Sequence, residues 1–403
     1  MIDLETFSFA PGFRATATAA GLKKNGALDM ALVAAESACS AAGVFTTNRV
    51  KAAPVRYDMA LLQQGAAGVR AMVINAGNAN AVTGPQGDAD CLRMAELTAY
   101  GLRCQPDQVL VLSTGVIGRQ LDMAKVTQGI AELTSSVASV GAHHAALAIM
   151  TTDTRPKTAS ATVAIDGVSV TIAGMCKGAG MIHPNMATMI AVVTTDAAVA
   201  PPLLDAALRR AADRSFNRIS VDGDTSTNDT LLLLASGASG LTIDGGAALD
   251  AFGETLAAVC TDLAKQVARD GEGATRLVEL RVLGAVDEAM AHTVGNAIAK
   301  SPLVKTAIHG FDPNWGRILC ATGYSGAAID PETITLTFGA GEDSIVLLDR
   351  GVPTPADLAA ASALLCRDPV HIAIDLGLGA ATTTMWFCDF SKEYVEINAH
   401  YTT

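Results

Sequence analysis

The sequence predicts an α/β protein, and three of its features support this. Short apolar runs end in glycine or small polar residues, as the buried strands of such proteins do. Alanine-rich segments with helical spacing lie between these runs. The chain has 403 residues, half of them hydrophobic, which is enough apolar material for two or three domain-sized units.

In the first half of the chain the expected strands and helices alternate. AMVINAG (71–77) is expected to form a strand and DCLRMAELTAYGLR (90–103) a helix. VLVLSTG (109–115) gives the next strand. The turn region GMIHPNMA (180–187) is the clearest break near the middle, and an apolar strand follows it.

The second half continues the pattern. A helix is expected over 201–216, where two prolines precede an apolar stripe. LLLLASG (231–237) gives a strand, and helices fit 255–269 and 286–300. No repeat and no low-complexity linker divides the chain.

Composition excludes several classes of function. The formal charge of −12 and pI near 5.0 disfavour nucleic-acid binding, and so do the sparse aromatic residues. No apolar run reaches the roughly 18 residues that a membrane helix needs. The N-terminus lacks the features of a signal peptide. We therefore expect a soluble, cytoplasmic protein with no membrane partner.

Metal and nucleotide sites are not expected either. The eight cysteines contain no C-x-x-C pair, which indicates reduced, buried thiols, with Cys176 in a packing role. The acidic run VDGDTSTNDT (221–230) resembles a calcium loop, but counted from Asp222 it has Thr227 at position 6 and Leu233 at position 12. A hydrogen-bonded turn explains the run better. Phosphate-binding glycine motifs are absent, so no bound cofactor is expected.

One threonine stands at the start of the central apolar strand, in KGAGMIHPNMATMIAVVTTDA (177–197). A threonine hydroxyl is a weak nucleophile without a base. Cleavage before Thr188 would supply one, because a free α-amine has a pKa of about 7.7–8.0. The hydroxyl itself can make the cut by attacking the Ala187 carbonyl. The alternative is a β-branched residue that starts a strand because it packs well there.

The same stretch resembles the cleavage and nucleophile motif of the bifunctional ornithine acetyltransferase/N-acetylglutamate synthase family. Eight further stretches match in the family's order, so the resemblance covers the whole chain. They are GVFTTNRVKAAPV (43–55), VINAGNANA (73–81), STGVIG (113–118), MTTDTRPK (150–157), SVDGDTSTNDT (220–230), GEGATR (271–276), DPNWGRIL (312–319) and YVEINAHYTT (394–403). The sequence departs from the family at two nearby positions. The family usually has a small residue where His183 stands, and often a serine where Ala179 stands. His183 beside the scissile turn could alter the cleavage rate.

The resemblance implies a self-cleaving enzyme. Cleavage between Ala187 and Thr188 gives an α chain, 1–187, and a β chain, 188–403, which stay together and assemble as an α2β2 heterotetramer. The implied fold is α/β, with layered sheets and helices of the N-terminal-nucleophile type that self-processing aminopeptidases share.

The implied reaction moves acetyl from N-acetylornithine to glutamate in arginine biosynthesis, with acetyl-CoA as a further donor. Thr188 would carry the acetyl group, and Thr114 and Gly115 would form the oxyanion hole, although a Thr-Gly pair after a strand also suits a simple turn. A self-processing aminopeptidase or amidase would give the same acyl-enzyme to water. A non-enzymatic binding protein would neither cleave nor turn over.

Substrate-binding residues also follow from the resemblance. They are Thr154, chosen over Thr152, with Lys177, Thr188, Glu272, Asn398 and Thr403. A lysine ammonium suits an α-carboxylate, and a glutamate carboxylate suits a substrate ammonium. Without the resemblance, these would be solvated surface charges and a frayed tail.

Overall fold

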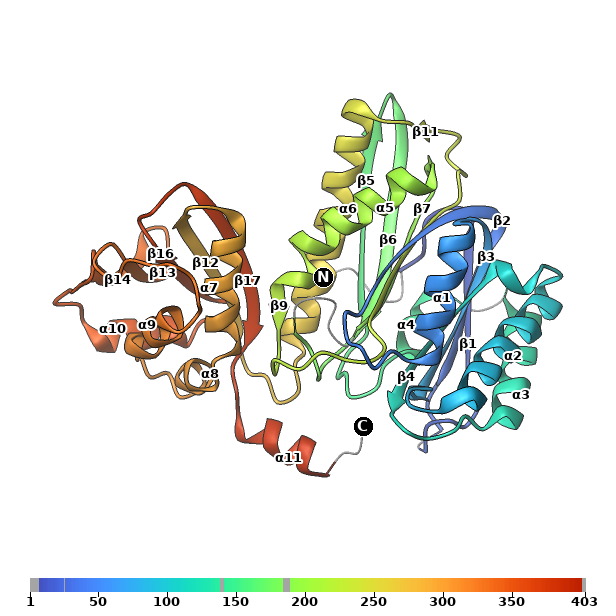
Figure 1. The fold of residues 1–403 in the computed structure, drawn as a ribbon, viewed down its shortest axis with the longest axis horizontal. Coiled ribbons are helices and arrows are strands. Elements are labelled where there is room, and N and C mark those ends of the chain that lie inside the picture. Colours follow the sequence, from blue (N-terminus) through green and yellow to red (C-terminus); the bar gives the residue numbers. More distant parts are fainter. Residues whose placement is uncertain (1–6, 25, 138–140, 184–188, 401–403) are drawn as a thin grey trace.

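The computed structural model describes residues 7–24, 26–137, 141–183 and 189–400, and two large sheets organise them (Figure 1). The first sheet has eight strands and the second, from the C-terminal part of the chain, has seven. A short parallel pair, β8 (Ala198–Val199) with β11 (Thr242–Ile243), lies apart from both.

The first sheet has the strand order β4-β3-β2-β10-β7-β6-β5, and β1 also pairs with β2. These strands are β1 (Phe13–Thr18), β2 (Met30–Phe45), β3 (Ala67–Asn78), β4 (Val109–Val116), β5 (Lys157–Ile165), β6 (Val168–Lys177), β7 (Ile190–Thr195) and β10 (Thr230–Ala235). β7 lies between β6, its antiparallel partner, and β10, its parallel partner. The segments before and after residue 188 are therefore strands of one sheet.

Both faces of this sheet are buried, which explains why β10 reads as an unbroken apolar run. Leu231 and Leu233 point into a core formed with α5 (Pro201–Arg214) and α6 (Gly246–Arg269). Leu232 and Leu234 join a second core on the opposite face, with α4 (Ala142–Ala148). A third core packs α2 (Gly84–Leu102) and α3 (Met123–Ser136) against β2, β3 and β4. The fold is thus a layered α/β fold, as predicted.

The second sheet has the order β15-β14-β13-β16-β12-β17-β9 and a core of its own (Figure 1). Its strands are β9 (Ile219–Ser220), β12 (Leu277–Ala285), β13 (Thr335–Ala340), β14 (Asp343–Asp349), β15 (Val352–Pro353), β16 (Val370–Asp375) and β17 (Ala381–Cys388). The helices of this region are α7 (Glu288–Lys300), α8 (Pro302–His309), α9 (Trp315–Gly323) and α10 (Leu358–Leu365). β9 of the second sheet directly precedes β10 of the first sheet, so the loop between these two strands connects the sheets.

The remaining helices are α1 (Ala53–Gln64), α11 (Lys392–His400), η2 (Pro106–Gln108) and η3 (Phe216–Arg218). Every strand and helix expected from the sequence is present, but two helices start earlier than predicted. α2 begins at Gly84 and α6 at Gly246, because Gly84 and Pro85 at the start of α2 and Gly246 at the start of α6 read as loops in the sequence.

The expectation of buried cysteines is confirmed for five of the eight, whereas Cys104 is only partly buried. All are free, but Cys320 and Cys366 are exposed. In α9 the buried face is formed by Ile318, Ala321 and Thr322, which leaves Cys320 on the solvent side. Cys176 packs in the core, as expected.

Two features of the described residues bear on membrane insertion and metal binding. None of their helices is long and apolar enough to span a membrane. No group of three or more His, Cys, Asp or Glu side chains is arranged among them to hold a metal ion.

Candidate active site

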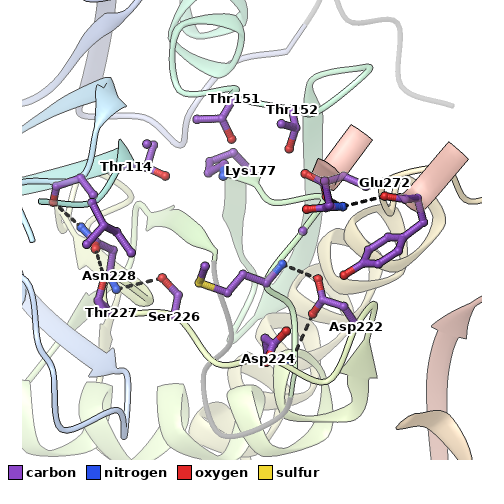
Figure 2. Close-up of a pocket in the computed structure, with 17 residues that line it drawn as sticks. Thr114, Thr151, Thr152, Lys177, Asp222, Asp224, Ser226, Thr227, Asn228 and Glu272 are labelled. Atoms are coloured by element: carbon purple, nitrogen blue, oxygen red, sulfur yellow. Dashed lines mark hydrogen bonds between the residues drawn. The ribbon is translucent and has the colours of Figure 1, made fainter. Parts of the chain in front are cut away.

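A pocket of about 700 Å³, its open mouth included, lies where β4, β6 and the loops after α6 and β9 meet. Five residues predicted from the sequence line it: Thr114, Gly115, Lys177, Glu272 and Asn398. Figure 2 shows Thr114, Lys177 and Glu272 around this space, each from a separate segment. The other lining residues are Ala79, Ile117, Thr151, Thr152, Gly180, Met181, Asp222, Asp224, Ser226, Thr227, Asn228 and Tyr394. The charged and hydroxyl-bearing lining of the pocket suits a small polar ligand.

Lys177 is the last residue of β6 and is only 3% exposed. Within the described residues its ammonium has no hydrogen-bond partner and no carboxylate within 4 Å. Burial lowers the pKa of Lys177, while the charges of Asp153 and Glu272 act in the opposite direction. A buried ammonium in a pocket wall, with no direct partner in the described part of the chain, is a good receptor for a ligand carboxylate.

Glu272 lies in the loop after α6 and is 7% exposed. The Asn398 side chain in α11 donates to its Oε2 at 2.8 Å, and the Glu272 backbone N–H donates to the Ala179 carbonyl at 2.8 Å. A β-carbon at Gly180 would lie 2.5 Å from Glu272 Oε2. Glycine at position 180 therefore makes room for the carboxylate, which gives the pocket an acidic wall.

Thr114 and Gly115 end β4 at the other side of the pocket. Gly115 has φ +131°, and a β-carbon there would lie 2.3 Å from the Gly77 carbonyl carbon, so only glycine fits. The Asn228 amide holds this segment by donating to the Ser113 carbonyl at 2.8 Å. The Thr114 hydroxyl and the Gly115 backbone, both in strand β4, are thus held together at the pocket.

The acidic run 221–230 forms a hydrogen-bonded turn rather than a metal loop. Asp222 accepts the backbone N–H groups of Met181 at 2.6 Å and Ile182 at 2.9 Å. Burial raises the pKa of Asp222 to about 6, although these hydrogen bonds oppose the shift. Asp222 therefore fixes the backbone just before the predicted cleavage site.

The start of β7 is held by a second acid of the same run. The Met189 N–H donates to Oδ1 of Asp229 at 3.0 Å, and Asp229 is fully buried. Burial raises the pKa of Asp229 well above its usual value. The predicted cleavage residues Ala187 and Thr188, and the predicted ligand residue Thr403, lie outside the described residues.

The structure places Thr154 elsewhere than the resemblance implied. It is exposed, does not line the pocket, and its hydroxyl and backbone N–H both donate to Asp270. Thr151 and Thr152, from the same turn, line the pocket instead. Spacing along a tight turn did not decide which threonine points inward.

His183 is half-buried, and its Nδ1 lies 3.3 Å from the Ser220 hydroxyl. Burial, with smaller effects from Lys300 and His292, lowers the pKa of His183 to about 4. The side chain is therefore neutral near pH 7. Its effect on the cleavage rate stays a prediction.

Several lining residues were missed in the sequence, although each lies in a stretch that carried the resemblance. Asp222, Ser226, Thr227 and Asn228 belong to SVDGDTSTNDT, and Tyr394 begins the C-terminal stretch. The available signal was their place in stretches that match the family, although SVDGDTSTNDT contains no residue that was predicted for the site.

Comparison with known proteins decides the family. The ArgJ family model matches residues 14–403. The chain belongs to the ArgJ family. The arginine biosynthesis bifunctional protein ArgJ of Symbiobacterium thermophilum is 48% identical over 396 residues, which are 97% of this chain and 97% of that protein. The protein of the same name from Synechocystis sp. is 47% identical over 403 residues, 97% and 96% of the two chains.

A solved structure agrees with this assignment. The crystal structure of the arginine biosynthesis bifunctional protein ArgJ from Bacillus halodurans is 46% identical, with a TM-score of 0.50. It covers 52% of this chain and 98% of its own. The resemblance found in the sequence is confirmed, and this ArgJ-family chain is an acyltransferase of arginine biosynthesis.

Proposed function

We propose that this ArgJ-family chain transfers acetyl from N-acetylornithine to glutamate through an acetyl ester on Thr188, and that acetyl-CoA serves as a second donor. The observation that carries the proposal is one pocket in which the Lys177 ammonium, the Glu272–Asn398 pair and the Thr114–Gly115 segment meet. The two amino-acid substrates share an α-carboxylate and differ at the far end. One cationic and one acidic wall suit such a pair.

The nucleophile would be created by self-cleavage between Ala187 and Thr188, which gives chains 1–187 and 188–403. β7 would then belong to the second chain but stay hydrogen-bonded to β6 of the first. β10 of the second chain is likewise paired with β2 of the first. These ladders would hold the cleaved chains together, and we propose that two such pairs assemble as an α2β2 heterotetramer.

The reaction balances with one nucleophile and one base. The Thr188 hydroxyl attacks the acetyl carbonyl of N-acetylornithine, and the freed Thr188 α-amine takes the hydroxyl proton. The C–N bond breaks, the proton passes to the leaving amine, and ornithine departs. The glutamate amine then attacks the ester carbonyl and the C–O bond to Thr188 breaks. The amine proton passes through the Thr188 α-amine to the Thr188 oxygen, and N-acetylglutamate departs. Thr114 and Gly115 would donate to the oxyanion in both halves.

Substrate recognition would divide between the two walls. Lys177 would bind the shared α-carboxylate, and Glu272 with Asn398 would meet the distal group. Thr154 stays the predicted threonine contact, and Thr152, which lines the pocket, is the alternative. Thr403 would complete the site from the C-terminus.

Initial-rate kinetics test the covalent step. At several fixed glutamate concentrations, plots of reciprocal rate against reciprocal N-acetylornithine concentration should give parallel lines, because donor and acceptor use one pocket in turn. Intersecting lines would indicate a ternary complex and remove the acetyl-threonine. Free acetate measured alongside separates transfer from the hydrolysis that an aminopeptidase or amidase would show.

A further inference from the structure

A charged cluster without a role in the proposed reaction lies behind the pocket wall. The Lys157 side chain is fully buried, and its ammonium lies 2.6 Å from Asp153 Oδ1 and 2.6 Å from Asp270 Oδ2. Lys157 belongs to β5 and pairs in register with Cys176, the residue before Lys177. A buried ammonium shared by two buried carboxylates is an expensive arrangement that hydrophobic residues could replace.

Both carboxylates also hold the backbone of segments that line the pocket. Asp153 accepts the N–H of Thr151 at 2.9 Å and that of Gly178, which follows Lys177, at 2.7 Å. Asp270 lies two residues before Glu272 and accepts the N–H of Thr154 at 3.1 Å. One ammonium thus connects the 151–154 turn, the end of β6 and the Glu272 loop.

Charge links the cluster to Lys177. Burial alone would raise the pKa of Asp153, but Lys157 first, and Lys177 next, hold it below its usual value. Asp153 and Lys177 therefore interact, although they make no ion pair within 4 Å. Without Lys157, the cations left to compensate the Asp153 charge would be Lys177 and Lys23, both of which interact with Asp153.

We propose that Lys157 is a positioning residue for substrate binding: it neutralises Asp153 and so leaves the Lys177 ammonium free for the substrate carboxylate. This inference rests on the proposed function, in which Lys177 binds that carboxylate. It gives a role in substrate binding to a residue that touches no substrate.

The test compares Lys157→Met with the charge-balanced double variant Lys157→Met/Asp153→Asn. In the single variant Asp153 draws Lys177 away, so KM for glutamate should rise about tenfold or more, with kcat per cleaved enzyme nearly unchanged. The double variant removes the competing carboxylate and should recover most of that rise. A double variant no better than the single one would overturn the proposal.

Two controls keep the result interpretable. Ile298→Ala opens a cavity in the separate core of the second sheet and should lower stability without raising KM. If Lys157→Met does not fold, the pH dependence of kcat/KM is measured for the single variant Asp153→Asn instead. Removing the Asp153 charge should lower the pKa of Lys177 further, so the alkaline fall of kcat/KM should move to lower pH. A loss that is equal at every pH would mean a structural role only and would refute the proposal.

Calorimetric titration with glutamate measures the same effect as a Kd and needs no turnover. Wild-type enzyme that binds glutamate but transfers no acetyl would count against the proposed function alone. Equal Kd values for wild type and Lys157→Met would count against the inference alone.

Discussion

Replacing Glu272 by glutamine would remove one negative charge from the pocket wall while keeping its shape. The side chain is 7% exposed, and glutamine can still accept the Asn398 hydrogen bond seen at 2.8 Å. In a desolvated pocket, a substrate ammonium should bind a carboxylate about 1–3 kcal/mol more strongly than it binds a neutral amide. The loss for a substrate with a distal ammonium should therefore be about 5- to 150-fold in kcat/KM.

Glutamate should respond differently because its distal group is a carboxylate. Glu272 repels it unless water, a proton or the Asn398 amide intervenes. In Glu272→Gln, kcat/KM for glutamate should therefore rise, or fall by less than about threefold. The assay measures kcat/KM for N-acetylornithine and for glutamate, and for ornithine as acceptor in the reverse direction.

Glu279→Gln provides a matched control. Glu279 is a partly buried glutamate on β12 that pairs with Lys265 and does not line the pocket. It should leave both specificity constants unchanged. Equal losses for both substrates in Glu272→Gln would show that Glu272 holds the shape of the pocket. They would refute its role in distinguishing a distal ammonium from a distal carboxylate.

Two further predictions concern the oxyanion segment and the cleavage turn. Gly115→Ala should lower the rate of acetyl transfer about 100-fold or more, because a β-carbon would displace one oxyanion donor. The control Gly118→Ala should lower the rate far less, because Gly118 has φ +77° but open space around it. Equal losses in the two variants would contradict the assignment of Gly115 to the oxyanion hole. Precursor cleavage, followed by pulse-chase in cell-free translation, should slow as pH falls below about 6, because Asp222 then loses the charge that accepts the Met181 and Ile182 N–H groups. Asp222→Asn should cleave slowly at every pH, and a wild-type pH step retained in this variant would assign the step to another group.

Local patterns predicted the strands well, because β3, β4 and β10 are apolar runs buried on both faces. Helix starts were less predictable. Gly84 and Pro85 at the start of α2 and Gly246 at the start of α6 are residues that usually mark loops.

The pocket residues that the sequence singled out lie in distinctive stretches: Thr114 and Lys177 near the ends of strands, and Glu272 in the loop after α6. The direction of side chains in the 151–154 turn was not, because neighbouring threonines differ only in backbone geometry. The Lys157–Asp270 contact joins residues 113 positions apart, and no local pattern signals it.

Intact-mass spectrometry of the denatured enzyme tests the central claim most directly. We predict two chains that begin at Met1 and Thr188, and a mass increase of one acetyl group on the second chain alone after mixing with N-acetylornithine. Glutamate should then remove that acetyl group, and Thr188→Ala should give one uncut, inactive chain. An active wild-type enzyme that consists of a single full-length chain, or that never acquires the acetyl group, would contradict the account.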